Sequence, residues 1–201
     1  MRAWIDLYSA HRVARTLTNK KWDSELRKRL IMLADSGHCD PSVEGRFTYK
    51  TRDSLAQWGI LGDRENESIA LTNLPDLAVA DLTVMALVSR TSPPHLHQFT
   101  VMVEGLRQGG SPWALAVHLP DDRETAQNPS GDRQGLGAGS HAALHCHVGP
   151  DLDIAPQVRV PLPPLGPVEL LEWVLSQILP NKDFEPAPWA VVKTALKKTT
   201  P

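Results

Sequence analysis

The chain has 201 residues, of which 41% are hydrophobic and 22% are charged. This length fits one large domain or two small ones, and this balance excludes a disordered chain and a fibrous rod. With Cys39 and Cys146 as its two cysteines, the sequence contains neither a disulfide framework nor a Cys-x-x-Cys metal motif. No apolar run approaches the ~20 residues of a membrane span, and Asp6 lies where a signal peptide would be apolar. We therefore expect a cytoplasmic protein that does not enter a membrane.

The net charge of −2 is unevenly distributed along the chain. Residues 1–64 hold 12 Lys and Arg against 8 Asp and Glu, whereas residues 65–201 hold 9 against 15. A basic half can attract nucleic acid or an acidic partner, and ordinary solvated helix faces explain the same imbalance. The candidate nucleic-acid contacts are Arg12, Arg15, Lys20, Lys21, Arg27 and Lys28.

The first part of the chain is predicted to be helical. Apolar residues recur at three- and four-residue spacing over residues 4–14, which indicates an amphipathic helix. Leu26, Leu30 and Leu33 form the buried stripe of a second helix, and Gly37 ends it.

Shorter elements are expected between residues 47 and 71. Alternation over residues 47–49 predicts a strand, residues 54–59 indicate a further helix, and residues 68–71 indicate a second strand. This order of elements resembles a winged helix-turn-helix, and the basic excess lies in the same region. Plain scaffolds with the same order of elements are the alternative.

Residues 76–90 are apolar nearly all round, so they should be enclosed on most sides. Their length and their Ala, Leu and Met content predict a central helix that joins the two halves, while the valines leave a buried strand as the alternative. Pro93 and Pro94 end the element, since proline cannot donate a backbone hydrogen bond.

The hydrophobic period changes from 3.6 to 2 in the second half of the chain. Residues 95–104 and 113–119 alternate on either side of a Gly-Gly turn, which predicts a β-hairpin. The remaining expected elements are a strand over 141–148, an edge strand or a polyproline segment within 156–165, a helix from Pro167 to Leu179 and a last helix over 188–198.

The predicted fold is therefore α+β, in two modules. Residues 1–74 form a mildly basic helical module, and residues 75–201 hold the central helix and a small antiparallel sheet packed against a C-terminal helix.

Histidine is the residue type whose placement is organised, since six of the eight lie within residues 95–147. Strand alternation turns three of them to the face opposite the apolar set, and these are His118, His145 and His147. Three imidazoles can hold a zinc-type divalent ion with a fourth position open to water. Glu104 or His141 would carry the proton. Structural histidines, solvated or hydrogen-bonded, are the alternative.

Two further features allow binding. Residues 120–140 form a long polar segment in which four glycines and Arg133 can approach a phosphate, with a flexible linker as the alternative. Trp173 and Trp189, on stiff proline-flanked segments, suit docking to another subunit, and packing on their own sheet is the alternative.

The leading functional hypothesis is a non-enzymatic adaptor or regulatory subunit of bacterial type within a larger assembly. It would bind a protein partner or a second copy of itself, with nucleic-acid contact open through the basic half. The hypothesis follows from the absence of a recognisable catalytic motif in the sequence. The alternative is a metal-dependent hydrolase of esters or phosphodiesters, so whether the chain is an enzyme stays open.

Overall fold

A computed structural model describes residues 15–61, 68–121, 144–150, 158–162 and 165–179. These residues form one antiparallel sheet of eight strands, together with three helices. The strands are β1 (Phe47–Arg52), β2 (Leu55–Ile60), β3 (Ile69–Leu71), β4 (Leu77–Ser89), β5 (Leu96–Arg107), β6 (Pro112–Leu119), β7 (His145–Gly149) and β8 (Val158–Pro161). The helices are α2 (Trp22–Asp35), α3 (Val43–Arg46) and α5 (Pro167–Ile178).

The sheet is organised around the long strand β4. The order is β1-β2-β4-β5-β6-β7-β8, and every neighbouring pair is antiparallel. β5 pairs with one edge of β4, while β2 and β3 share the other edge end to end. β2 pairs with Met85–Ser89, and β3 pairs with Ala80–Leu82. Both strands therefore take their place in the sheet by pairing with β4.

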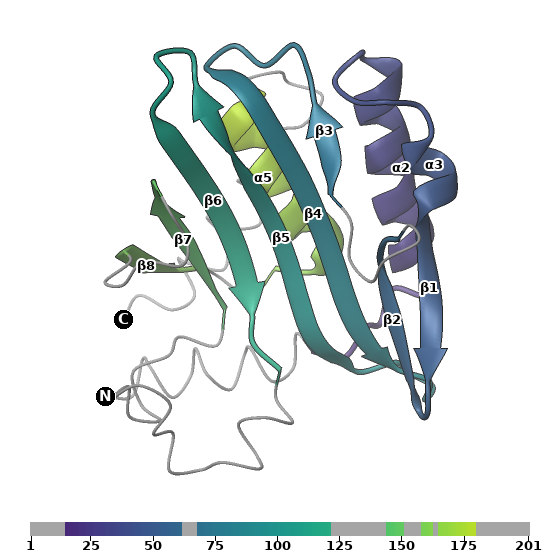
Figure 1. Cartoon of the computed structure of the whole chain (residues 1–201). Coiled ribbons are helices and arrows are strands. Elements are labelled where there is room, and N and C mark those ends of the chain that lie inside the picture. Colours follow the sequence, from purple (N-terminus) through teal and green to yellow (C-terminus); the bar gives the residue numbers. More distant parts are fainter. Residues whose placement is uncertain (1–14, 62–67, 122–143, 151–157, 163–164, 180–201) are drawn as a thin grey trace.

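Both long helices pack on one face of the sheet and enclose the core. In Figure 1, α5 is seen behind β4 and β5, so the view is onto the opposite face. The fully buried helix residues are Leu26, Leu30 and Leu33 of α2 and Leu171, Val174 and Leu175 of α5. They join one continuous hydrophobic cluster with the inward side chains of β4, β5 and β6. The helix-covered face therefore supplies the main hydrophobic stabilisation of the fold.

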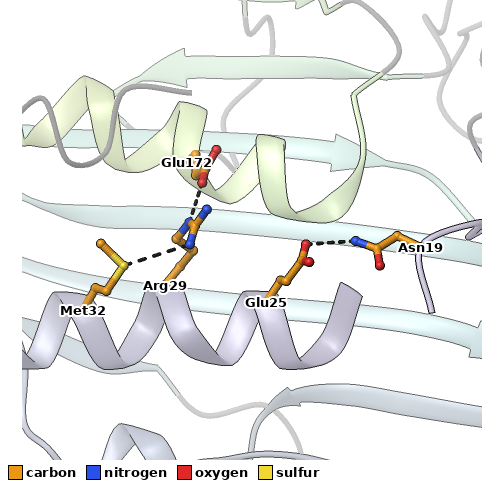
Figure 2. A network of polar contacts seen from close by, with 5 residues as sticks. All are labelled: Asn19, Glu25, Arg29, Met32 and Glu172. Atoms are coloured by element: carbon orange, nitrogen blue, oxygen red, sulfur yellow. Dashed lines mark hydrogen bonds and ion pairs between the residues drawn. The ribbon is translucent and has the colours of Figure 1, made fainter. Parts of the chain in front are cut away.

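An ion pair joins the two helices across this layer. Nε of Arg29 on α2 donates to the carboxylate of Glu172 on α5, and Figure 2 shows the pair between the two helices. Glu172 is only 5% exposed, so the guanidinium compensates a carboxylate held away from water. Nearer the start of α2, the side-chain amide of Asn19 donates to Glu25 at 2.8 Å. The ion pair therefore ties α2 to α5, and the Asn19–Glu25 bond holds the segment that precedes α2.

Hydrogen bonds from Arg15 link the segment before α2 to the sheet. Its guanidinium donates to the carbonyls of Leu96 and His97 at 3.3 and 2.5 Å and to that of Pro120 at 2.9 Å. The backbone N–H of Leu96 in turn donates to the carbonyl of Arg15 at 2.7 Å. Arg15 is therefore a buried internal contact that links the start of β5 to the end of β6.

The prediction of a helical N-terminal half is wrong. α2 is the one long helix that the structure describes before residue 75, and residues 55–60, expected as helix, form β2. β1 and β2 form a hairpin at the edge of the large sheet, so the described residues do not have a winged helix-turn-helix order. The sheet also crosses residue 74, since β1 to β3 precede it and β4 to β8 follow.

The expected central helix over residues 76–90 is also wrong, because β4 occupies this segment. Residues 80–88 alternate between buried and less buried positions, which is the period of a strand. The alternation is masked in the sequence because Met85 and Leu87, on the outer side, are as apolar as the inner Val84 and Val88.

Other predicted elements are confirmed. α2 buries its predicted leucine stripe, and α5 begins at Pro167 as expected. β5 and β6 form the predicted hairpin, whose turn places Gly110 at a φ of 79°, a conformation that glycine adopts without strain. β8 is the predicted edge strand. The helices expected over 4–14 and 188–198 lie outside the described residues, as does the Gly-rich part of segment 120–140.

Candidate functional site

The candidate site is the side of the sheet that faces away from the helices. On β5, Phe99, Val101 and Val103 are fully buried against the helix layer, and the residues between them point to the other side. In Figure 1, no described helix or strand lies in front of the central strands on this side. We call this side the open face. Its residues on the central strands are Val79, Asp81, Thr83, Met85, Leu87, Gln98, Thr100, Met102, Glu104, Leu106, Ala114, Ala116, His118, His145 and His147.

Large apolar side chains follow β4 and β5 across the open face. Met85, Leu87 and Met102 are half-buried. Val79 and Leu106 are paired across the two strands and are 55% and 42% exposed. We call these five residues the apolar strip. Apolar side chains gathered on one accessible face mark an interaction surface more often than scattered ones do.

Two carboxylates interrupt the apolar strip. Asp81 and Glu104 lie directly opposite each other across β4 and β5, and both are exposed. The hydroxyl of Ser68 donates to Oδ1 of Asp81 at 3.4 Å. Like charges directly opposite on a sheet repel each other, so a cation or an N–H donor placed over this acidic pair would stabilise it.

The structure brings His118, His145 and His147 together on the open face, as strand alternation predicts. His118 pairs directly with His145 across β6 and β7, and their ring centroids are 5.7 Å apart. The rings of His145 and His147 are 4.6 Å apart. Nδ1 of His118 lies 3.1 Å from the hydroxyl oxygen of Thr100 on β5. We call these three residues the histidine trio, of which His145 is fully buried and the other two are half-buried.

The geometry of the trio differs from that of a metal centre. Within the described segments, no group of three or more His, Cys, Asp or Glu side chains is arranged to hold a metal ion. Glu104, expected as a proton carrier, pairs with Ala114 and lies four residues along β5 from the row that contains His118. That spacing corresponds to about 14 Å along a strand. His141, the other expected proton carrier, lies outside the described residues.

Cys146, between two histidines, points to the helix-covered face. It is 2% exposed and belongs to the hydrophobic core cluster. The register of β7 therefore makes this thiol a small buried hydrophobe.

The candidate nucleic-acid contacts do not form one surface. Arg15 is buried and bonded to carbonyls, and one guanidinium N–H of Arg27 donates to the carbonyl of Phe47 at 2.9 Å. Lys20, Lys21 and Lys28 are exposed around α2. Arg12 lies outside the described residues.

The two tryptophans expected as docking anchors are not equally described. Trp173 is half-buried on α5 and packs against the core cluster, which fits packing on its own fold. Trp189 lies outside the described residues.

A separate pocket of about 480 Å³ opens beside the start of α2. It lies between residues 17–22 and residues 91–94, and Trp22, Lys20 and Pro93 are among its lining residues. Among the described residues of this lining, Lys20 is the one that carries a charge.

The residues that sequence reasoning missed are those of the apolar strip and Asp81. The sequence contains a signal for the apolar strip. A half-buried strand normally alternates apolar with polar residues, whereas residues 84–88 are all apolar. Apolar residues on both sides of a strand are typical of a strand covered on both sides, and among the described elements the helices lie on one side of β4.

Comparison of this chain with family models, with curated proteins and with solved structures finds no match. Among the residues that the structure describes, no helix has the length and apolar content of a membrane span. The function must therefore be argued from the site itself.

Proposed function

We propose that this chain is a non-enzymatic adaptor subunit that works within a larger assembly and docks another protein subunit across the open face. The observation that carries the proposal is the apolar strip, which places two methionines, two leucines and a valine on the side of the sheet away from the helices. Covering such side chains stabilises a complex by about 25 cal/mol for each Å² of apolar surface removed from water.

The size of the open face fits a protein interface. Strands β2, β4, β5, β6 and β7 at a spacing of about 4.8 Å make a face about 24 Å wide. The stretch from Val79 to Leu87 adds a length of about 27 Å, so the flat area is about 650 Å². A standard interface takes about 800 Å² from each partner.

The chemistry of the strip suits docking more than catalysis. Methionine is flexible and polarisable, so Met85 and Met102 can adapt to a partner surface. The acidic pair between the apolar residues gives the face a polar feature that favours one orientation, because this end of the face attracts the N–H donors or cations of a partner.

The test compares the size of the native assembly formed by the wild type and by a face variant. The tagged full chain is expressed in its source cells, and complexes are sized, identified and rebuilt from purified components. We expect Met85→Glu/Met102→Glu to abolish the rebuilt complex, because two carboxylates would be buried without partners. Lys28→Glu, an exposed change on α2, is the control and should leave the complex intact.

Two outcomes would contradict the adaptor function. One is a rebuilt complex that tolerates Met85→Glu/Met102→Glu. The other is stoichiometric zinc or manganese in the purified protein that is lost in His145→Ala/His147→Ala, together with ester or phosphodiester hydrolysis, which would favour the hydrolase instead.

Binding of nucleic acid through the basic N-terminal residues is a separate branch with its own test. Such binding would weaken steeply with salt and with Lys20→Glu/Lys21→Glu. The engagement of Arg15 and Arg27 with backbone carbonyls leaves this branch with less support than the open face.

A further inference from the structure

We infer that the subunit docked on the open face is a second copy of this chain, packed face to face about a two-fold axis. This inference rests on the proposed function, since it names the partner for the same surface. A two-fold interface joins the same patch on both copies, so the patch must be complementary to itself. The open face meets this requirement in its apolar centre and in the placement of its polar groups.

The polar groups of the open face lie on opposite sides of the Met102–Ala116 pair. Asp81 and Glu104 lie toward one end of β4 and β5, whereas His118 and His145 lie toward the other end of β6 and β7, and His147 lies beside Ala116 on β7. Met102 of β5 and Ala116 of β6 are directly paired between these two groups.

A diagonal two-fold axis between Met102 and Ala116 exchanges these groups between copies. It places the acidic pair of one copy over the half-buried His118 and His147 of the other, and the symmetry gives this contact twice in each dimer. Imidazole N–H groups are donors and carboxylates are acceptors, so the two corners are complementary. The strands of the two sheets then cross at nearly a right angle, which is one of the two common modes of sheet packing.

The side chains near the axis allow the two sheets to approach. Ala114 and Ala116 are the shortest side chains of the open face on β6, and both are buried below their neighbours. Stacked sheets lie about 10 Å apart, with side chains of both filling the space. Because the two alanines do not rise above their neighbours, the flexible Met85 and Met102 of one copy can lie over them in the other.

The experiment measures the mass of the purified full chain in solution by light scattering or sedimentation. At chain concentrations up to about 100 µM, a Kd in the micromolar range gives a dimer. We expect twice the chain mass for the wild type and for Lys28→Glu, and the chain mass for Met85→Glu/Met102→Glu. Circular dichroism and the midpoint of thermal unfolding confirm that each variant is folded.

A charge exchange tests the orientation of the two copies. Glu104→Lys should weaken the dimer by roughly tenfold or more, because its ammonium would face the partner's imidazoles. Adding His147→Glu to the same chain should restore association, since the exchanged charges again face each other in the dimer. Failure of the second change to restore a dimer weakened by the first overturns the inferred arrangement.

The outcomes separate this inference from the proposed function. A monomeric wild type overturns the inference that the partner is a second copy. The adaptor function still stands if a different protein binds the wild type and does not bind Met85→Glu/Met102→Glu. A dimer that tolerates that double change also overturns the inference. A monomer with no face-dependent partner overturns both.

Discussion

The helix-covered face and the open face differ in how their apolar residues are covered. On β5 the two faces are easily told apart, because the fully buried Val101 and Val103 alternate with the half-buried Thr100 and the exposed Glu104. On β4 they are not, because the outer Met85 and Leu87 are as apolar as the inner side chains. Burial by α2 and α5 accounts for the inner set alone, and the outer set is the surface on which the proposed partner would dock.

The first way to test this difference is to shorten one leucine on each side of β4. Leu82→Ala should lower the free energy of unfolding by about 2–5 kcal/mol, because Leu82 is fully buried in the core and its truncation leaves a cavity. Leu87→Ala should lower it by less than about 1 kcal/mol in the isolated chain, because Leu87 is half-exposed. Urea unfolding measures both. Equal losses would show that the open face is covered as completely as the other.

The second prediction concerns Gly105, where the backbone of β4 leaves no space for a side chain. Gly105 pairs with Ala80, next to the irregularity between Leu77 and Val79, and an added Cβ would lie 2.0 Å from the carbonyl oxygen of Val79. Gly105→Ala should therefore lower the free energy of unfolding by about 1–3 kcal/mol, because backbone must shift to accept the methyl group. Gly109→Ala in the next turn is the control, since no atom lies within 4 Å of its added Cβ. Unchanged stability of Gly105→Ala would contradict the described pairing.

The elements with a single covered face were those that could be predicted from the sequence. α2 and α5 show an apolar stripe with helical period, and the β5–β6 hairpin shows a period of 2 around a Gly-containing turn. In each of these elements, local periodicity and tertiary burial agree.

The strands in the first half of the sheet could not be predicted, because they are stabilised by pairing with strands that lie elsewhere in the sequence. β2 is a strand because it pairs between β1 and β4, and β4 joins residues from both halves of the chain. Within one 15-residue window an element that is apolar all round fits a buried helix as well as a strand. The sequence pattern therefore indicated that residues 76–90 are enclosed on several sides. It led to the prediction of a helix, where the structure has the strand β4.

The candidate site was predicted in part for the same reason. The side on which His118, His145 and His147 emerge follows from alternation alone, and the structure confirms that they lie together. The apolar strip depends on knowing that β4 is a strand, and the internal role of Arg15 depends on contacts more than 80 residues away.

The third prediction tests whether the helix layer depends on its ion pair. Arg29→Met should lower the free energy of unfolding by about 1–2 kcal/mol, because the carboxylate of Glu172 would stay buried without its donor. Arg29→Met/Glu172→Leu should recover most of that loss, because an apolar pair carries no desolvation penalty. Thermal and urea unfolding of both variants measure the coupling. A double variant less stable than Arg29→Met would show that the pair stabilises the helices by more than charge compensation.

The smallest expected effect concerns Cys39, which belongs to the hydrophobic core cluster and forms an isolated bridge with Leu71. Burial, with a further contribution from the charge of Asp40, raises the pKa of the Cys39 thiol to about 11. The thiolate is the reactive form, so in a Cys146→Ala background iodoacetamide at pH 8 should label Cys39 roughly 100-fold more slowly than an ordinary thiol. The rate should rise with pH toward 11, and the fold should lose stability over the same range, because the unfolded thiol releases its proton first. The same variant unfolded in guanidinium supplies the reference rate. Equal rates in the folded and unfolded chain would show that this part of the core opens to solvent.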